Sequence, residues 1–211
     1  MHAPVTTHDE ASTMTTTPSA ATWRPTTPQA PDLSLFQQIP LATDGTVTEL
    51  LSLYCGQPVT ARKLAQSVQE DDTRATGDDA NPDTAGAADQ HAVTKSSQAI
   101  ALPRLLRSVV LQDAGGRPLL HAQSCFALEL MPASIRHDLQ HTTLPIGLLW
   151  RRERLEMYRE IQACECGTAP AVAALLQVAP DAPLLRRTYV LFHQRLPMGA
   201  ITETFAMTVL R

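Results

Sequence analysis

The last stretch of the chain, residues 184–211, most constrains the fold. Residues 184–192 are rich in β-branched and aromatic side chains, residues 193–197 form a polar turn, and residues 198–209 extend again, which predicts a β-hairpin. Alternate side chains of a strand share one face, so Glu203 lies among apolar neighbours. These neighbours are Ile201, Phe205 and Met207. Burying a lone charge costs several kcal/mol, so Glu203 is neutralised, paired with another residue or available to a ligand.

A second predicted hairpin supplies the candidate partner of Glu203. Residues 104–112 and 119–128 are typical of strands and flank a glycine-containing turn, DAGGRP. On the first of these strands, Arg107 lies on a face that is otherwise apolar. Two interpretations remain open: Arg107 and Glu203 form a buried salt bridge, or they face a shared cavity and bind the two polar ends of a small ligand. An arginine suits a carboxylate because its planar fork donates two parallel hydrogen bonds, whereas a glutamate accepts from a hydroxyl or moves a proton.

Helical patterns surround these hairpins. Thr46 and Glu49 have the spacing of a capping box, and the apolar positions that follow end at Gly56, where a C-terminal glycine is expected. The other predicted elements are helices at residues 132–141, from residue 144 and at residues 168–178, and strands at residues 57–68 and 151–166. For residues 151–166 a helix is the alternative. We therefore predict an α+β fold in which a single antiparallel β-sheet has helices packed to one side.

Two segments lack the large apolar residues that a packed core needs. Residues 1–32 are mostly Thr, Pro, Ala and Ser, and we predict that they form a disordered tail. Residues 69–98 hold seven acidic residues and no Leu, Ile, Phe, Tyr or Trp, which indicates a disordered acidic insertion, with a lid over a site as the alternative. The folded domain is predicted to span residues 33–211 apart from this insertion.

Charge and hydropathy exclude several classes of protein. The chain has 17 basic and 21 acidic residues, but without residues 1–34 and 69–98 it keeps 14 basic and 11 acidic ones. This slight positive charge suits a small anionic ligand and falls well short of a nucleic-acid-binding surface. The sequence contains neither an apolar run long enough for a membrane span nor a secretory signal pattern, so we expect a monomeric cytoplasmic protein.

The four cysteines do not have the spacing of a disulfide framework, which suits a reducing compartment. Cys164 and Cys166 form a C-x-C sequence, but no further His or Cys follows at the spacing of zinc ligands. We interpret both cysteines as small apolar residues of a strand and predict no metal site.

The order of the short motifs resembles a known family. Along the chain these motifs are Leu105–Leu111, Arg117–Leu120, Pro145-Ile-Gly147 and Ile201-Thr-Glu203. Their sequence and spacing resemble the chorismate lyase family, in particular its cyanobacterial and actinobacterial branch. The resemblance implies a chorismate lyase-like fold and an enzyme, chorismate pyruvate-lyase, that eliminates pyruvate from chorismate and leaves 4-hydroxybenzoate, a quinone precursor. It also implies that no metal or organic cofactor takes part.

The same resemblance implies roles for individual residues. Arg107 would bind the ring carboxylate, and Glu203 would contact the hydroxyl at the opposite end of the ring. The backbone amides of Ile146 and Gly147 would help to hold a carboxylate, and Val47 would form an apolar cover over the ring. Gln123 stands where some family members have a basic residue, and we include it among the predicted substrate contacts.

A function of a different class is a non-catalytic effector-binding domain, because the ligand-sensing domain of one bacterial family of transcription regulators resembles the same fold. Fold alone does not determine function. Such regulators place a basic winged-helix domain before the sensor, whereas the first 34 residues of this chain contain one arginine and no helical pattern. The sequence therefore favours the lyase and predicts no nucleic-acid partner.

Overall fold

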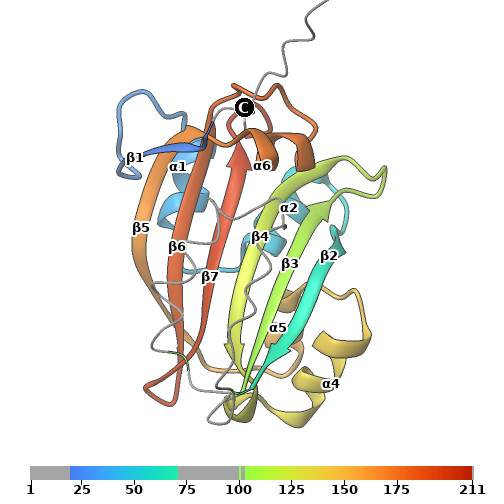
Figure 1. The fold of residues 1–211 in the computed structure, drawn as a ribbon. Helices are drawn as coiled ribbons and strands as arrows, with labels where there is room; N and C mark the ends of the chain where they lie inside the picture. The colour runs from blue at the N-terminus through green and yellow to red at the C-terminus, as the bar shows by residue number, and fades with distance from the viewer. Residues whose placement is uncertain (1–19, 71–99, 101–102, 211) are drawn as a thin grey trace, which may run out of the picture.

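The computed structural model describes residues 20–70, 100 and 103–210. Seven strands form one antiparallel sheet in the order β1-β5-β6-β7-β4-β3-β2 (Figure 1). The strands are β1 (Thr22–Pro25), β2 (Thr60–Gln69), β3 (Arg104–Gln112), β4 (Pro118–Ala127), β5 (Tyr158–Thr168), β6 (Leu184–His193) and β7 (Leu196–Ala206). The described helices are α1 (Leu35–Ala42), α2 (Val47–Cys55), α4 (Ala133–His141), α5 (Ile146–Arg152) and α6 (Pro170–Leu175), with a short 3₁₀ turn at Leu128–Leu130. The predicted α+β fold with a single antiparallel sheet is confirmed.

The C-terminal hairpin predicted from the sequence is formed by β6 and β7. Gln194 and Arg195 make its two-residue turn with φ angles of 50° and 66°, which matches the twist of the flanking strands. A β-bulge follows directly, because Leu191 pairs with Gly199 whereas Phe192 pairs with Pro197. The extra residue shifts the register of the hairpin by one position.

The hairpin of β3 and β4 has the same two features. The side chain of Asp113 accepts hydrogen bonds from the backbone amides of Gly115 and Arg117, which stabilises the turn. A β-bulge again follows the turn, since Leu111 pairs with Leu120 but Gln112 pairs with Pro118. As a result, residues of β3 lie opposite partners one position further along β4 than a regular ladder would give.

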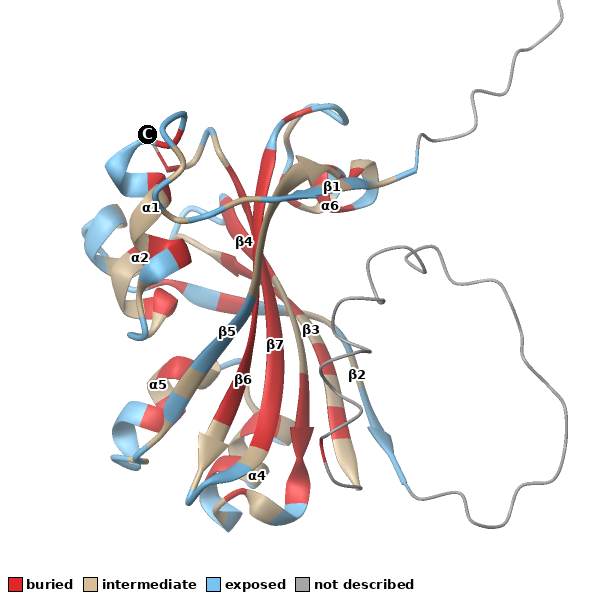
Figure 2. Ribbon diagram, turned by 90° about the vertical axis from the view of Figure 1, so that its left-hand side faces the viewer, coloured by how far each residue is buried: buried red, intermediate tan, exposed pale blue. Residues whose placement is uncertain are grey.

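Four helices cover one face of the sheet, as Figure 2 shows from the side. Helices α1 and α2 pack on the ends of β3, β4, β6 and β7 through a core that includes Leu41, Leu51 and Phe205. Helices α4 and α5 pack on the other part of the same face around Leu139 and Trp150. The prediction that helices pack to one side is correct for these four helices. Helix α6 instead packs with the first residue of β6 and the last residue of β7 in a small separate cluster.

The ordered structure begins earlier than predicted. Within the predicted tail, Thr22–Pro25 form strand β1, which pairs with Thr168 to Glu165 of β5 at the edge of the sheet. Trp23 anchors it, because the guanidinium of Arg186 lies 3.9 Å from the centre of the indole ring. The predicted boundary at residue 33 is therefore wrong. Residues 1–19 of the predicted tail and residues 71–98 of the predicted insertion lie outside the described residues.

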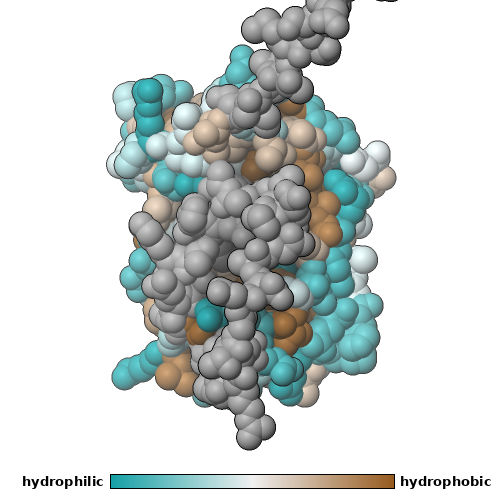
Figure 3. Space-filling model, viewed as in Figure 1, coloured by the Kyte–Doolittle hydropathy of each residue, from teal (hydrophilic) through white to brown (hydrophobic). Residues whose placement is uncertain are grey.

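The opposite edge of the sheet is strand β2, predicted from the alternation of residues 57–68. Most of its outer residues are polar and exposed, among them Arg62 and Ser67, and a β-bulge interrupts its pairing after Lys63. Figure 3 shows hydrophilic residues along the side of the molecule where β2 and α4 lie. Charge and a bulge on an edge strand oppose pairing with another chain. Among the described helices, none is long and apolar enough to cross a membrane.

Candidate functional site

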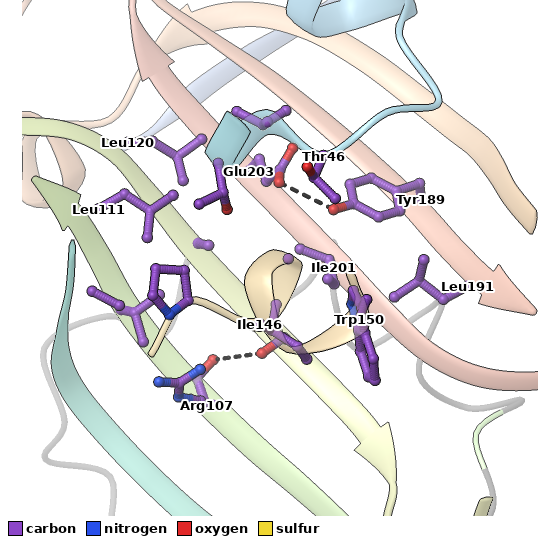
Figure 4. A pocket seen from close by; sticks show the side chains of 18 of the residues that line it. Thr46, Arg107, Leu111, Leu120, Ile146, Trp150, Tyr189, Leu191, Ile201 and Glu203 are labelled. Atoms are coloured by element: carbon purple, nitrogen blue, oxygen red, sulfur yellow. Dashed lines mark hydrogen bonds between the residues drawn. The ribbon is translucent and has the colours of Figure 1, made fainter. Parts of the chain in front are cut away.

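A pocket lies on the covered face of the sheet, where the starts of α2 and α5 meet above the central strands. Its floor consists of side chains from β3, β4, β6 and β7, and its empty space, including the opening to solvent, is about 580 Å³. Figure 4 shows Arg107 at one end, Glu203 with Tyr189 at the other, and Ile146 and Ile201 between them. A mostly apolar lining with few polar groups is typical of small-molecule sites.

Arg107 is a buried cation without an anion. Its side chain is 5% exposed, and its Nε and Nη2 atoms are buried without a hydrogen-bond acceptor among the described residues. Burial lowers the pKa of the Arg107 guanidinium. Lys63, on the neighbouring strand, lies close enough to Arg107 to be affected by it, because burial and then the charge of Arg107 lower the pKa of the Lys63 amine. A buried guanidinium that faces a pocket and has no anion among the described residues can form charge-assisted hydrogen bonds with an anionic ligand.

Glu203 at the other end is bonded through both oxygens. Arg187 Nε donates to Oε2 at 2.7 Å, and the Tyr189 hydroxyl donates to Oε1 at 3.0 Å. Arg187 is 1% exposed, and its Nη1 donates to the backbone carbonyl of Thr43 at 2.8 Å. Burial acts to lower the pKa of Arg187, but Glu203, Tyr189 and Cys164 together outweigh it and the pKa is raised. The Glu203 side chain is thus fixed in position by Arg187 and Tyr189.

This arrangement decides between the two interpretations of the Arg107 and Glu203 pair. The partner of Glu203 is Arg187, so the buried salt bridge between Arg107 and Glu203 is absent from the described structure. Arg107 lies opposite Ser124, and Ser124 lies opposite Ile201, two residues from Glu203 on β7. Two strand spacings of about 4.8 Å and two residues of about 3.4 Å place the two Cα atoms roughly 12 Å apart. The two side chains therefore lie at opposite ends of the pocket (Figure 4).

The structure places the predicted cover residues at the pocket. Val47 begins α2 and Ile146 and Gly147 begin α5, and all three line the pocket. A Cβ atom on Gly147 would lie 3.0 Å from Thr48 Oγ1, so glycine allows the two helix starts to approach closely.

The predicted C-terminal glycine of α2 is confirmed, because Gly56 has a φ of 66°. The capping box differs, since the Thr46 hydroxyl donates to the Glu49 carboxylate at 2.8 Å instead of capping an amide.

Gln123 does not line the pocket, and its prediction as a substrate contact is wrong in position. A regular ladder from the β3–β4 turn would place Gln123 opposite Arg107, but the bulge places Ser124 there and Gln123 opposite Ser108. Successive side chains of a strand point to opposite faces, so Gln123 points away from the pocket. Its Oε1 is buried without a partner among the described residues, and nothing in the structure explains this.

The sequence analysis did not predict the pocket residues Tyr189 and Arg159, nor Arg187, which binds Glu203 from beside the pocket. The alternation of β6 carried the signal for two of them, because Leu185, Arg187, Tyr189 and Leu191 share one face. The predicted apolar role of the C-x-C cysteines is confirmed: both belong to strand β5, and both pack against the core of α1 and α2. Among the described residues, no cluster of three or more His, Cys, Asp or Glu side chains could hold a metal ion.

Comparisons with known proteins agree with this geometry. PhnF from Mycobacterium smegmatis has a TM-score of 0.51 at 13% identity, over 81% of this chain and 67% of that chain. The effector domain of the same PhnF has a TM-score of 0.49 at 13% identity, over 78% and 90% of the two chains. A GntR-family transcriptional regulator from Enterococcus faecalis V583 has a TM-score of 0.45 at 10% identity, over 72% and 96%. At these identities the likeness to PhnF shows a shared fold only.

Sequence comparison gives a more specific result. No curated protein is significantly similar in sequence to this chain. A family model described as "Chorismate pyruvate-lyase Rv2949c-like" matches residues 41–211, which include both hairpins, the pocket and the three covering helices after α1, namely α2, α4 and α5. The resemblance predicted from the short motifs is thereby confirmed, and the chain belongs to the Rv2949c-like chorismate pyruvate-lyase family.

Proposed function

We propose that this protein is a chorismate pyruvate-lyase that converts chorismate into 4-hydroxybenzoate and pyruvate. The observation that carries the proposal is the unpaired buried guanidinium of Arg107, which faces a fixed carboxylate, Glu203, across a ring-sized apolar pocket. A ring that has a carboxylate at one end and a hydroxyl at the other matches both groups. Membership of the family supports this choice of substrate.

The reaction that these groups would assist is an elimination. The C–H bond at the hydroxyl-bearing ring carbon breaks, its electrons form a ring double bond, and the neighbouring C–O bond to the enolpyruvyl group breaks. The released enolpyruvate gains a proton on carbon and becomes pyruvate, while the ring becomes aromatic. Because aromatisation supplies a large driving force, the protein needs mainly to position the substrate and stabilise the charge that moves to the leaving group. In the proposal no metal or organic cofactor takes part.

Each pocket residue has a role in this proposal. Arg107 binds the ring carboxylate with the parallel hydrogen bonds that its planar fork provides. Glu203 accepts a hydrogen bond from the ring hydroxyl, because Arg187 and Tyr189 hold its carboxyl group in a fixed orientation. Val47 and Ile146 cover the ring, and the backbone amides at the start of α5 lie beside it.

The decisive experiment is to incubate the purified full-length protein with chorismate and to follow pyruvate and 4-hydroxybenzoate. We expect both products in equal amounts and well above the uncatalysed rate. In Glu203→Gln, turnover should fall about 10- to 100-fold, since a neutral amide is a weaker acceptor than a carboxylate. The exposed Glu156→Gln, which lies outside the pocket, serves as the matched control. Wild-type protein that forms no pyruvate above the uncatalysed rate would refute the lyase function.

The fold shared with PhnF supports a second candidate, a domain that binds a small-molecule effector without converting it. The same pocket would then bind an aromatic carboxylate as its final ligand. The two functions differ in one measurement. Tight binding of 4-hydroxybenzoate to a protein that leaves chorismate unchanged would favour the effector-binding domain over the enzyme.

A further inference from the structure

Arg159 lines the pocket, and the proposed function assigns it no role. It lies on β5 and pairs with Leu191, and both line the same pocket. Its side chain is half-buried, as expected for a residue at the mouth of a pocket. Arg159 Nη1 donates a hydrogen bond to the backbone carbonyl of Asp44 at 2.5 Å. The guanidinium is thus held above the sheet, beside the segment that leads into α2.

The head of Arg159 lies at the Glu203 end of the pocket. Arg187, which binds Glu203, donates to the carbonyl of Thr43, and Arg159 donates to the carbonyl of the next residue, Asp44. Two guanidinium groups therefore end on consecutive peptide units. The pKa of the Tyr189 hydroxyl points to the same neighbourhood: burial and Glu203 raise it, while Arg187 and Arg159 oppose the rise. Arg159 is therefore close enough to Tyr189 for its positive charge to act on the pKa of the Tyr189 hydroxyl.

Arg159 also has no anionic partner in the part of the chain that the structure describes. Three other arginines near the pocket are paired: Arg187 with Glu203, Arg151 with Glu49 and Arg152 with Asp138. A guanidinium carries five N–H donors, and Asp44 accepts from one of them. The remaining donors and the full positive charge are available at the pocket mouth.

We infer that Arg159 binds the second carboxylate of the substrate, the one that leaves with the enolpyruvyl group. This inference rests on the proposed function. With the ring carboxylate on Arg107 and the hydroxyl on Glu203, the enolpyruvyl ether is attached to the carbon next to the hydroxyl. Its carboxylate then lies near the Glu203 end, where Arg187 is already bonded to Glu203. Arg159 is the pocket cation that remains for it.

This role has a chemical consequence. When the C–O bond breaks, its electron pair moves onto the enolpyruvyl oxygen, and a nearby guanidinium stabilises the growing negative charge. The ring product keeps a single carboxylate, so it no longer contacts Arg159. Arg159 should therefore distinguish dicarboxylate ligands from monocarboxylate ones, whereas Arg107 should bind both.

Two stable ligands test this without requiring turnover. One is 4-hydroxybenzoate, and the other is 4-hydroxybenzoate with a carboxymethoxy group at position 3, which carries a second carboxylate on an ether next to the hydroxyl. Their dissociation constants are measured by calorimetry for the full-length wild type and for Arg159→Gln, Arg159→Lys and Arg62→Gln. Arg62 is exposed on the opposite face of the sheet, so Arg62→Gln controls for the loss of one positive charge.

We expect Arg159→Gln to weaken the dicarboxylate about 10- to 100-fold and the monocarboxylate about twofold or less, because charge-assisted hydrogen bonds are lost only with the former. Arg159→Lys should recover part of the affinity, and Arg62→Gln should leave both constants unchanged. Equal losses for the two ligands, or no loss for either, would overturn the inference. The affinities could show the expected selective loss in Arg159→Gln while the wild type releases no pyruvate from chorismate. That result would refute the lyase function and still support Arg159 as a carboxylate contact.

Discussion

Two arginines lie on the same face of the sheet, at nearly the same depth, in opposite electrostatic situations. Arg187 is bonded to Glu203 and to a backbone carbonyl, and its pKa is raised despite burial. Arg107 has no anion in the described structure, and burial lowers its pKa. The sequence neighbourhoods of the two residues are similar, since both stand in apolar strands. The difference arises because the fold places the carboxylate of Glu203 beside Arg187, whereas none of the described carboxylates pairs with Arg107.

The comparison distinguishes a charge that stabilises the fold, called the structural charge, from a charge that is available to a ligand, called the binding charge. Removing one member of a buried ion pair leaves the other uncompensated, which destabilises the fold. Removing an unpaired buried charge relieves a desolvation cost and leaves the fold at least as stable. Arg187 is therefore expected to stabilise the protein, and Arg107 to bind the ligand. The predictions below test this division.

The largest effect is expected for Arg187→Met. Because Glu203 would remain buried without its cation, we expect the free energy of unfolding to fall by about 3–5 kcal/mol. Urea denaturation followed by circular dichroism measures this loss. In the double variant Arg187→Met, Glu203→Gln, much of the stability should return, since no buried charge is left unpaired. A loss below about 1 kcal/mol in the single variant would show that the pair is not structural.

Arg107→Met should have the opposite profile. We expect kcat/KM for chorismate to fall about 100-fold or more, because the ring carboxylate loses a charge-assisted pair of hydrogen bonds. The free energy of unfolding should stay the same or rise, which the same denaturation experiment measures. Arg107→Lys keeps the charge but not the planar fork, and it should fall between wild type and Arg107→Met. A strongly destabilised Arg107→Met with an intact KM would reverse the assignment of the two arginines.

A linked measurement uses the ligand itself. At a concentration 100 times its dissociation constant, 4-hydroxybenzoate should stabilise the wild type by about 2.7 kcal/mol. The same concentration should stabilise Arg107→Met by much less, because the binding charge is gone. Thermal unfolding with and without ligand measures both shifts. Equal stabilisation of the two proteins would place the carboxylate contact elsewhere.

The smallest effect concerns Tyr189, which completes the Glu203 end. At pH 8, Tyr189→Phe should lose about 0.5–1.5 kcal/mol of stability, the usual contribution of one hydrogen bond. Burial and Glu203 raise the pKa of Tyr189 above that of an unfolded tyrosine, which is about 10. The stabilising contribution is therefore full below about pH 10 and is lost as the pH rises further. The difference between wild type and Tyr189→Phe should shrink above pH 10, whereas the exposed Tyr158→Phe should show no such trend.

Much of the fold followed from side-chain patterns. Alternation and turn residues predicted both hairpins, and helix-capping sequences predicted α2 and α4. Strand β1 was missed because its residues have no apolar pattern of their own; they are ordered by pairing with β5 and by the contact of Trp23 with Arg186. Helix α5 continues to Arg152, where a strand had been predicted from residue 151, because Trp150 packs in the core.

Two β-bulges determine which residues lie beside Arg107 and Glu203. Extending a regular ladder from the β6–β7 turn would place Arg186 opposite Glu203, and extending one from the β3–β4 turn would place Gln123 opposite Arg107. In each hairpin a bulge one position from the turn shifts the register, so the true partners are Arg187 and Ser124. A one-residue shift moves every side chain to the other face. Residue patterns predicted Arg107 and Glu203 as site residues, but the bulges that select their neighbours left no clear signal in the sequence.

The hydrogen bonds from Arg187 and Arg159 to the segment before α2 leave the amino-acid sequence of that segment free to vary during evolution. Both bonds end on main-chain carbonyls, those of Thr43 and Asp44. Every amino acid supplies such an oxygen, so the side chains at these two positions can change without removing the acceptors. The attachment of the pocket cover to the sheet thus depends on two arginines and on the path of the backbone. Homologous proteins could differ freely at positions 43 and 44 and still close the same pocket.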